Sequence, residues 1–310
     1  MPTLKATITV DFDAVSGWLG DPEHQNNGLA HFSYGFMAGH VGVRRMLRLF
    51  KKLGIEEKVT WFITGHSMES FPKETAAIIA TGAEIGLHGY SHEDILALTE
   101  EQERDVLEKC IDISTKLLGK TPVGFRAPFT QMRPYSVQLL EEKGFLYDSS
   151  LGAHDSQLYR LAPAGGESVK LPVYKPEVKA SEWMKPNFWQ DGKGKIIEIP
   201  VNFYQEDVTP MLMIPHQPGS EGFVNPRQIE DMWKERFAFL LEEMEYLAAE
   251  GEDAEHTNFM INLHPDASGL PHVYRMLERF LMWLKDQEGQ TVEFVGMGEL
   301  ASRWQKAHPL

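Results

Sequence analysis

The sequence predicts an α/β fold that closes into a distorted (β/α) barrel of seven or eight units. Short apolar and β-branched runs alternate with amphipathic stretches through the 310-residue chain, and several runs end in a polar side chain. This alternation is typical of a parallel sheet covered by helices, and a barrel is its natural closure at this length. An open doubly wound sheet is the alternative. No Gly-x-Gly-x-x-Gly or Walker-type loop follows a predicted strand, which disfavours a nucleotide-binding version.

We expect the whole chain, residues 1–310, to form one domain. The predicted strands are 7–10, 59–63, 83–87, 123–125, 145–147, 196–201, 259–263 and 292–295. Amphipathic helices are predicted at 43–53, 72–79, 99–118, 136–143, 225–250 and 273–284. Thr99 and Gln102 form a capping box, while Gly54 and Gly119 each end a helix. Two long excursions, 16–39 and 152–194, lack a clear period, so we expect irregular loops there.

The composition excludes several classes of protein. A net charge of −15 argues against binding to nucleic acid, whose phosphates attract basic surfaces. No apolar run approaches the roughly 18–20 residues that cross a bilayer, and the N-terminus lacks the apolar core of a signal peptide. The single cysteine, Cys110, falls on a helical pattern and excludes an internal disulfide framework. These features predict a cytoplasmic protein without a membrane or nucleic-acid partner.

Two histidines four residues apart follow the predicted strand 83–87. His88 stands at the carboxyl end of that strand. Ser91 and Asp94 resemble a capping box, which would place His92 in the first turn of a short helix. Such a turn can aim both rings at one point, and histidine is a common ligand of zinc and similar metals. An isolated pair with this spacing is also compatible with two solvated loop residues. The choice between metal ligands and loop residues therefore depends on the other polar residues of the chain.

Reactive side chains also end other predicted strands. Asp11 and Asp13 follow the first strand, Arg126 ends the fourth, and His264 ends the seventh. In a parallel barrel the carboxyl ends of the strands surround one face, where such folds build their active sites. We therefore expect these side chains to meet His88 at a single site.

The residue types in this set suit metal-assisted hydrolysis of an amide or ester. Two neutral imidazoles and one carboxylate form a set of metal ligands that leaves room for water and substrate. The second aspartate can take a proton from the water, a distant histidine can protonate the leaving group, and the arginine can hold the basic carboxylate ionised. A metal-free mechanism would need a nucleophile. The sequence has no Gly-x-Ser-x-Gly elbow and no cysteine at a polar strand end.

Four of these segments, in chain order, resemble the signature motifs of the polysaccharide deacetylases, the NodB-homology family or carbohydrate esterase family 4. They are Asp11-Phe12-Asp13, His88-Gly89-Tyr90-Ser91-His92, Arg126-Ala127-Pro128-Phe129 and Leu263-His264-Pro265. The matches reach from about residue 5 to residue 300. The resemblance implies a single catalytic domain with a NodB-type distorted (β/α) barrel. It also implies removal of an acetyl group from an N-acetylated sugar of the peptidoglycan or chitin type.

The resemblance further implies roles for individual residues. One divalent ion, zinc in the first place with cobalt, manganese or nickel as alternatives, would be held by Asp13, His88 and His92. Asp11 would be the general base, Arg126 would orient it, and His264 would be the general acid. The backbone N–H of Phe129 would help to hold the oxyanion.

The chain departs from the family pattern at two points. The family usually has two adjacent aspartates before a glycine, whereas Phe12 separates Asp11 from Asp13 here. This spacing of the two aspartates is similar to that in a subgroup of the family, which contains intracellular bacterial peptidoglycan-deacetylase-like proteins and cyclic imide hydrolases. The acidic partner expected for the acid histidine has three candidates, Asp155, Glu198 and Asp207. Side chains that could contact substrate at the barrel mouth are Trp18, His66, Tyr90, Phe129 and Trp189.

Two other functions stay open. The same scaffold could hydrolyse a small cyclic imide or ureide, and the excursions at 16–39 and 152–194 could close the groove that a polymer needs. A catalytically silent protein that binds glycans is the alternative from a different class. Related intracellular members are often oligomeric, so the resemblance implies a homo-oligomer.

Overall fold

The computed structural model describes residues 3–19, 27–162, 173–184, 186, 192–213, 222 and 224–310. In this part of the chain, nine strands form one curled sheet in the order β6-β7-β5-β4-β3-β2-β1-β8, and β9 also pairs with β1. The strands are β1 Leu4–Phe12, β2 Val59–Ile63, β3 Glu84–Leu87, β4 Gly124–Phe125, β5 Tyr147–Asp148, β6 Tyr159–Arg160, β7 Ile197–Glu198, β8 Asn258–Leu263 and β9 Val292–Phe294. All recorded strand pairings are parallel except that of β6 with β7. The carboxyl ends of the parallel strands therefore meet at one end of the sheet.

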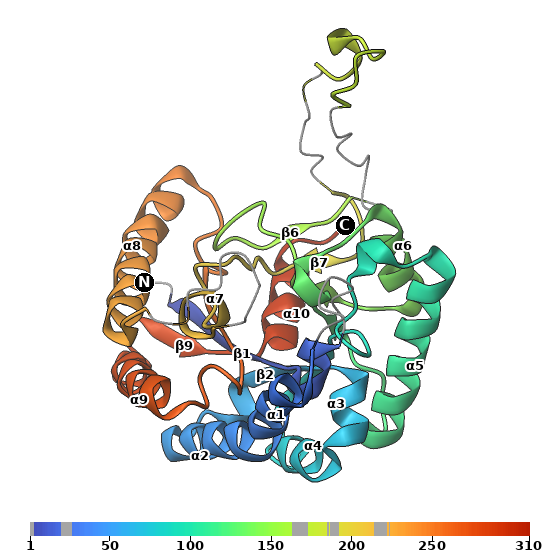
Figure 1. Cartoon of the computed structure of the whole chain (residues 1–310). Coiled ribbons are helices and arrows are strands. Elements are labelled where there is room, and N and C mark those ends of the chain that lie inside the picture. Colours follow the sequence, from blue (N-terminus) through green and yellow to red (C-terminus); the bar gives the residue numbers. More distant parts are fainter. Residues whose placement is uncertain are drawn as a thin grey trace.

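Helices surround the curled sheet (Figure 1). They are α1 Leu29–Met37, α2 Val43–Leu53, α3 Gly65–Ser70, α4 Pro72–Ile79, α5 Glu100–Leu118, α6 Pro134–Lys143, α7 Val208–Met211, α8 Pro226–Glu250, α9 Pro271–Lys285 and α10 Met297–Ala307. The capping box predicted for α5 is confirmed, because Thr99 Oγ1 accepts from Gln102 N at 3.2 Å while Gln102 Oε1 accepts from Thr99 N at 2.9 Å. Left-handed Gly54 and Gly119 end α2 and α5 as predicted. Within the described residues, none of these helices has the length and apolar character of a membrane span.

Among the described residues, the barrel closes through irregular backbone rather than through a further strand. β6 and β8 are the two ends of the sheet. The free edge of β8 is hydrogen-bonded by loop residues instead, since Asn258 N donates to Ser156 O at 2.9 Å and Asn262 N donates to Gln205 O at 2.8 Å. The predicted distorted barrel is confirmed in this incompletely closed form.

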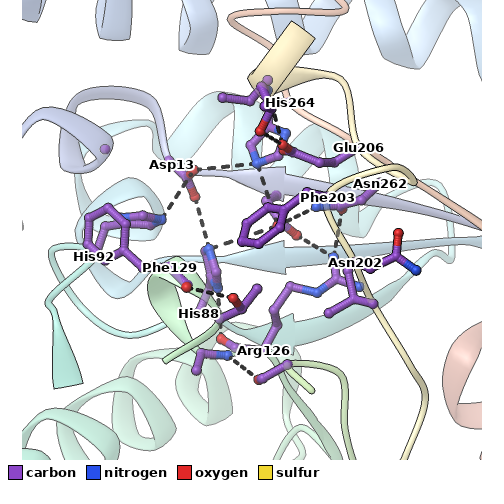
Figure 2. A pocket seen from close by; sticks show the side chains of 18 of the residues that line it. Asp13, His88, His92, Arg126, Phe129, Asn202, Phe203, Glu206, Asn262 and His264 are labelled. Atoms are coloured by element: carbon purple, nitrogen blue, oxygen red, sulfur yellow. Dashed lines mark hydrogen bonds and ion pairs between the residues drawn. The ribbon is translucent and has the colours of Figure 1, made fainter. Parts of the chain in front are cut away.

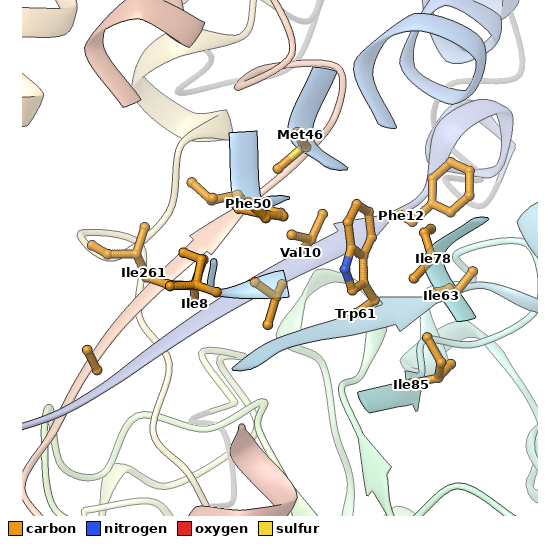
Figure 3. Close-up of a cluster of buried hydrophobic side chains, with 14 of the residues drawn as sticks. Ile8, Val10, Phe12, Met46, Phe50, Trp61, Ile63, Ile78, Ile85 and Ile261 are labelled. Atoms are coloured by element: carbon orange, nitrogen blue, oxygen red, sulfur yellow. The ribbon is translucent and has the colours of Figure 1, made fainter. Parts of the chain in front are cut away.

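The two-residue period of β1 separates an apolar face from a polar one. All nine residues of β1 are buried. The apolar face holds Leu4, Ala6, Ile8, Val10 and Phe12, part of a cluster that includes Trp61 of β2 and Met46 and Phe50 of α2 (Figure 3). The other face carries Lys5, Thr7, Thr9 and Asp11. Thr7 Oγ1 donates to Asn258 Oδ1 at 2.9 Å and Thr9 Oγ1 to Asn262 Oδ1 at 2.7 Å, so this face joins a polar network with β8. Because of the same two-residue period, the side chain of Asp11 also lies on this face and joins the network.

The prediction of an irregular loop over 16–39 is wrong for its second half. Residues 29–37 form α1, and a π-helical turn at Ala38–Gly42 joins it to α2. A Cβ atom at Gly35 would lie 2.6 Å from the backbone of Val15, so α1 approaches the short 3₁₀ helix Ala14–Trp18 through a glycine. Gly35 is the one buried residue of α1. The other contacts of α1 include ring contacts of its partly exposed side chains His31 and Tyr34 with Trp18. The helix therefore buries no apolar stripe, and a helical period is absent from its sequence.

Candidate metal centre and active site

A cavity of about 750 Å³ opens at the carboxyl ends of the strands. Most of the predicted site residues line it, although they come from segments far apart in the chain (Figure 2). Those that line it are Asp11, Asp13, Trp18, His88, His92, Arg126, Phe129 and His264. The expected convergence of strand-end side chains is therefore what the structure shows. It does not by itself assign a role to each of them.

Asp13, His88 and His92 form a compact cluster of metal-ligand type. The Nε2 atom of His88 lies 3.4 Å from Asp13 Oδ1, and that of His92 lies 3.6 Å from Asp13 Oδ2. All three side chains are nearly buried. Ligand atoms at these separations can share one ion of the zinc class, whose bonds to nitrogen and oxygen are about 2.0–2.2 Å long.

The hydrogen bonds around this cluster fit a cation at its centre. His88 Nδ1 lies 2.7 Å from the carbonyl oxygen of Arg126, so in the neutral ring Nδ1 carries the proton and Nε2 presents a lone pair. That lone pair faces Asp13 Oδ1, a buried oxygen with no hydrogen-bond donor among the described residues. Two acceptors facing each other need a positive charge between them. Burial lowers the pKa of His92 to about 4 despite the opposing charge of Asp13, which leaves that ring neutral and able to bind a metal.

His92 reaches this position through a loop, and the predicted capping box at Ser91 and Asp94 is wrong. His92 has a left-handed backbone with φ 59°. The carboxylate of Glu93 organises the loop by accepting from Tyr90 N at 3.0 Å and from Ser91 N at 2.7 Å. Ser91 thus bonds to Glu93, and Asp94 alone caps the short 3₁₀ helix Ile95–Ala97. Glu93 takes the Ser91 N–H group that the Asp94 carboxylate of a Ser-x-x-Asp box would have accepted.

Asp11 is held by a buried polar network. Its Oδ1 accepts from Arg126 Nη1 at 2.7 Å, and its Oδ2 accepts from Asn262 Nδ2 at 2.8 Å. Arg126 is itself fixed by the carbonyl and hydroxyl oxygens of Ser149, at 2.9 and 3.0 Å, and its guanidinium lies 4.2 Å from the centre of the Phe62 ring. Burial acts to raise the pKa of Asp11, but the charges of Arg126, His88 and His264 and the hydrogen bond from Asn262 together outweigh burial and hold the pKa well below its usual value. Asp11 is therefore an ionised carboxylate in a fixed orientation.

Asp207 is the acidic residue that the structure places against His264. Asp207 Oδ1 lies 2.7 Å from His264 Nδ1, and its Oδ2 accepts from the backbone N–H groups of His264 and Ser268 at 2.9 and 3.1 Å. The other two candidates lie elsewhere: Asp155 is exposed beside His154, and Glu198 accepts from backbone N–H groups beneath the cavity wall. Burial opposes the charged imidazole, yet Asp207 raises the pKa of His264 well above its usual value.

The free nitrogen of His264 faces the carboxylates across the cavity. His264 Nε2 lies 3.6 Å from Asp11 Oδ2 and 4.0 Å from Asp13 Oδ2. A substrate atom held between these groups would have a carboxylate on one side and a protonated imidazole on the other. This arrangement is suited to general acid–base chemistry.

Two of the predicted substrate contacts lie away from the cavity. His66 and Tyr90 do not line the cavity. The Tyr90 hydroxyl donates to Glu69 at 2.7 Å, and the His66 ring packs edge-on against Tyr90, so the pair faces the surface near α3. Trp18 and Phe129 do line the cavity, and the Phe129 ring contacts His92 with centroids 4.4 Å apart. Trp189 lies outside the described residues.

Several cavity residues were not identified from the sequence. They are Asn202, Phe203, Glu206, Val208, Leu212, Asn262 and Asp266. Most come from the segment after β7, which has no period that would mark it as part of a site. Asn262 is different, because a polar residue inside the apolar run 259–263 is itself a signal that the strand faces a polar interior.

A second buried carboxyl pair, Asp148 and Glu198, supports the cavity wall from beneath. Glu198 Oε1 accepts from the N–H groups of Ser150 and Leu151, at 2.8 and 2.9 Å, and both residues line the cavity. Glu198 Oε2 is buried and has no partner among the described residues that could donate to it. Burial and the neighbouring Asp148 raise the pKa of Glu198 well above its usual value, so Glu198 is the protonated member and can donate to Asp148.

We expect Glu198→Gln to make folding stability less sensitive to pH. The folded wild type holds a proton on Glu198 that the unfolded chain releases near pH 4.5. Its contribution to stability is therefore complete below that pH and is lost as the pH rises toward the raised folded pKa, at up to about 1.4 kcal/mol per pH unit. Glutamine donates to Asp148 without titrating. Denaturant unfolding at pH 5 to 8 should show the variant gaining on wild type as the pH rises, and a constant difference would contradict the protonated Glu198.

Comparison with known proteins identifies the family of this chain. The family model for polysaccharide deacetylase matches residues 33–147. A peptidoglycan deacetylase-like protein of Gibberella zeae is 48% identical over 96% of this chain and 85% of its own length. A peptidoglycan deacetylase of Helicobacter pylori is 37% identical over 97% of this chain and 96% of its own. The crystal structure of a putative polysaccharide deacetylase from Mycobacterium smegmatis superposes with a TM-score of 0.76 at 26% identity, covering 98% of this chain and 92% of that one. The chain belongs to the polysaccharide deacetylase family, whose members hydrolyse the amide C–N bond of N-acetyl groups.

Proposed function

We propose that this deacetylase uses a divalent metal ion to remove acetyl groups from N-acetylglucosamine units of a peptidoglycan- or chitin-type glycan. The observation that carries the proposal is the placement of Asp13, His88 and His92 in one wall of a cavity that also holds Asp11 and His264. The names of the two relatives with high identity and near-complete coverage support the glycan substrate. Zinc is the proposed ion, because two imidazoles and a carboxylate suit zinc better than magnesium or calcium, with cobalt, manganese or nickel as alternatives.

The residues of the chain can carry out the reaction around such an ion. When bound, the ion acidifies a water molecule and polarises the acetyl carbonyl. Asp11 takes the proton of the attacking water, and Arg126 and Asn262 keep its carboxylate ionised and pointed into the cavity. The backbone N–H of Phe129 is proposed to stabilise the negative charge that develops on the acetyl oxygen.

His264 is the proposed donor to the departing amine nitrogen. Its Nε2 faces the cavity while Asp207 binds Nδ1, so the proton on Nε2 is the one available to substrate. Transfer of this proton lets the C–N bond break with a neutral amine as the leaving group. Asp207 acts through His264 as a positioning residue, because it both orients the ring and keeps it charged.

We expect Asp207→Asn to shift the pH dependence of kcat rather than only its maximum. Asp207 raises the pKa of His264, so its neutral replacement lowers that pKa. The proposed acid must be protonated, and the fall in rate on the alkaline side should therefore move to lower pH. A kcat profile between pH 5 and 10 tests this. An unchanged alkaline limb would show that Asp207 does not set the protonation of the acid.

A paired assay tests the proposed substrate class. Acetate release from oligomers of N-acetylglucosamine and from peptidoglycan fragments is compared with ring opening of succinimide and hydantoin by the same zinc-loaded protein. We expect acetate release that a chelator abolishes. Ring opening alone would favour the small cyclic amide alternative, and no turnover of any amide would favour a silent glycan-binding protein. A cytoplasmic location and homo-oligomeric assembly stay predictions from the sequence.

A further inference from the structure

A second cluster of metal-ligand type lies away from the active site. Its members are Asp253, His256 and His308, and their ligand atoms lie within 4.8 Å of one another. Asp253 and His256 belong to the turn between α8 and β8, whereas His308 follows α10 at the end of the chain, beside β6 (Figure 1). The proposed reaction uses none of these residues.

The turn between α8 and β8 presents the carboxylate and one ring. Asp253 Oδ1 accepts from the backbone N–H groups of Glu255 and His256, at 3.1 and 3.2 Å. These bonds fix the carboxylate and occupy its Oδ1. The Oδ2 atom lies 3.5 Å from His308 Nε2 and accepts no backbone donor among the described residues, while His256 Nδ1 lies 2.9 Å from Oδ2 and 3.0 Å from Oδ1. Ligands of one tetrahedral ion with bonds of about 2.0–2.1 Å are separated by roughly 3.0–3.5 Å, so the distance from Oδ2 to His308 Nε2 suits a shared ion. His256 Nδ1 lies at hydrogen-bond distance from the carboxylate, and it would exchange that hydrogen bond for a bond to the ion.

His308, like His88, has its Nδ1 atom beside a backbone carbonyl oxygen. His308 Nδ1 lies 3.0 Å from the carbonyl oxygen of Trp304, so in the neutral ring it carries the proton. Its Nε2 lone pair then points toward Asp253 Oδ2, another acceptor. The ring is held in place because it stacks on Trp304 with centroids 4.4 Å apart. At His88 a backbone carbonyl likewise fixes Nδ1 while Nε2 faces a carboxylate oxygen, at 2.7 and 3.4 Å.

The cluster is partly open to solvent and lies far from the active site. His256 is buried and Asp253 is about one-fifth exposed, while His308 is the open side of the cluster, so an ion could enter from solvent and keep a water ligand. His256 precedes the amino end of β8, whereas His264 follows its carboxyl end. The intervening strand puts roughly 20–25 Å between the two sites, too far for a shared reaction. The amino end of a barrel is where stability rather than catalysis is built.

We propose that Asp253, His256 and His308 form a second metal site, which takes a divalent transition-metal ion of the zinc class and fastens the end of α10 to the turn before β8. Two imidazoles and one carboxylate favour Zn²⁺, Ni²⁺ or Cu²⁺ over Mg²⁺ or Ca²⁺. The ion satisfies the two facing acceptors and links segments 52 residues apart in sequence, from His256 to His308. Because it binds only the folded chain, it stabilises the fold without taking part in turnover.

Metal counting with variants at each site tests the proposal. The full chain, freed of any affinity tag, is stripped with a chelator, dialysed against zinc and analysed by mass spectrometry for bound metal. We expect two zinc ions per chain in the wild type and one in His308→Ala, with acetate release unchanged in that variant. His154→Ala is the matched control, since His154 also pairs with an aspartate but has no second imidazole in a described cluster, and it should keep both ions.

A second variant and a second readout keep the outcome decisive. Asp253→Asn removes the proposed ligand charge, and it should also bind one ion. Combined with His88→Ala, a variant without the catalytic site, it should abolish the rise in melting temperature that zinc produces in His88→Ala alone. If wild type binds a single ion that is lost in His88→Ala and kept in His308→Ala, the second site is overturned and the catalytic site stands. If that single ion is instead lost in His308→Ala and kept in His88→Ala, the catalytic site is overturned and the second site stands. Wild-type stoichiometry in both His308→Ala and Asp253→Asn would also overturn the proposal.

Discussion

Replacement of His88 by alanine is expected to remove the catalytic ion and, with it, deacetylation. His88 is a buried proposed ligand whose Nε2 faces Asp13 Oδ1 at 3.4 Å, and alanine leaves only two ligands from the chain. Loss of a residue that merely orients a ligand lowers metal affinity by roughly 10–100-fold, so loss of the ligand itself should cost at least that much. Calorimetric zinc titration and acetate release should fall together, with turnover reduced at least 10³-fold at stoichiometric zinc, an order-of-magnitude expectation.

A neighbouring histidine provides the control for this variant. His66 also follows a strand on the same side of the sheet, yet it does not line the cavity. His66→Ala should keep both the zinc affinity and the rate of wild type, and circular dichroism should show that both variants are folded. Wild-type zinc affinity at the catalytic site of His88→Ala would remove that residue from the ligand set.

Replacement of His264 by alanine is expected to lower kcat by roughly 10²–10⁴-fold while the catalytic ion stays bound, because this is the usual contribution of a positioned general acid. The imidazole lies against Asp207 rather than in the Asp13, His88 and His92 cluster, so its loss should not empty the metal site. Acetate release and metal content measured on the same preparation separate the two effects.

The leaving group tells a proton donor from a structural residue. In an acetyl ester of an acidic phenol, the leaving group departs as a phenolate anion and needs no proton. Hydrolysis of this ester should therefore fall much less in His264→Ala than hydrolysis of the N-acetyl amide does. His272→Ala, an exposed position at the start of α9, is the control and should match wild type with both substrates. Equal losses with the ester and the amide would mean that His264 positions groups rather than donating a proton.

The sequence was sufficient for the fold and for the residues at strand ends because both depend on short-range patterns. Asp11 follows the polar face of β1 by the two-residue period, and Asp13 continues the same alternation beyond the strand. Phe12, which separates them, packs outward against Phe71 with ring centroids 5.8 Å apart. The spacing that departs from the family pattern therefore still brings both carboxylates to the cavity.

The parts that could not be predicted depend on long-range contacts. Asp207 meets His264 from a position 57 residues earlier, through an irregular segment that also closes the barrel. No local pattern distinguishes it from Asp155 or Glu198. The loop that carries His92 was predicted wrongly for a different reason, since Glu93 takes the Ser91 N–H group that the predicted helix cap would use.

Side-chain direction at the cavity mouth was equally invisible in the sequence. Tyr90 lies between His88 and His92, yet its hydroxyl turns outward to Glu69. Phe203, from a segment without a period, lines the cavity instead (Figure 2). Motif position shows that a residue is near a site, whereas the direction of its side chain depends on contacts that only the folded chain provides.

The most direct test of the proposed metal centre is anomalous diffraction at the zinc edge from crystals of the zinc-loaded protein. We predict an anomalous peak about 2.0–2.2 Å from a carboxylate oxygen of Asp13 and from Nε2 of His88 and of His92. A difference map with no peak among these three side chains, in crystals where zinc is bound elsewhere on the chain, would contradict the account.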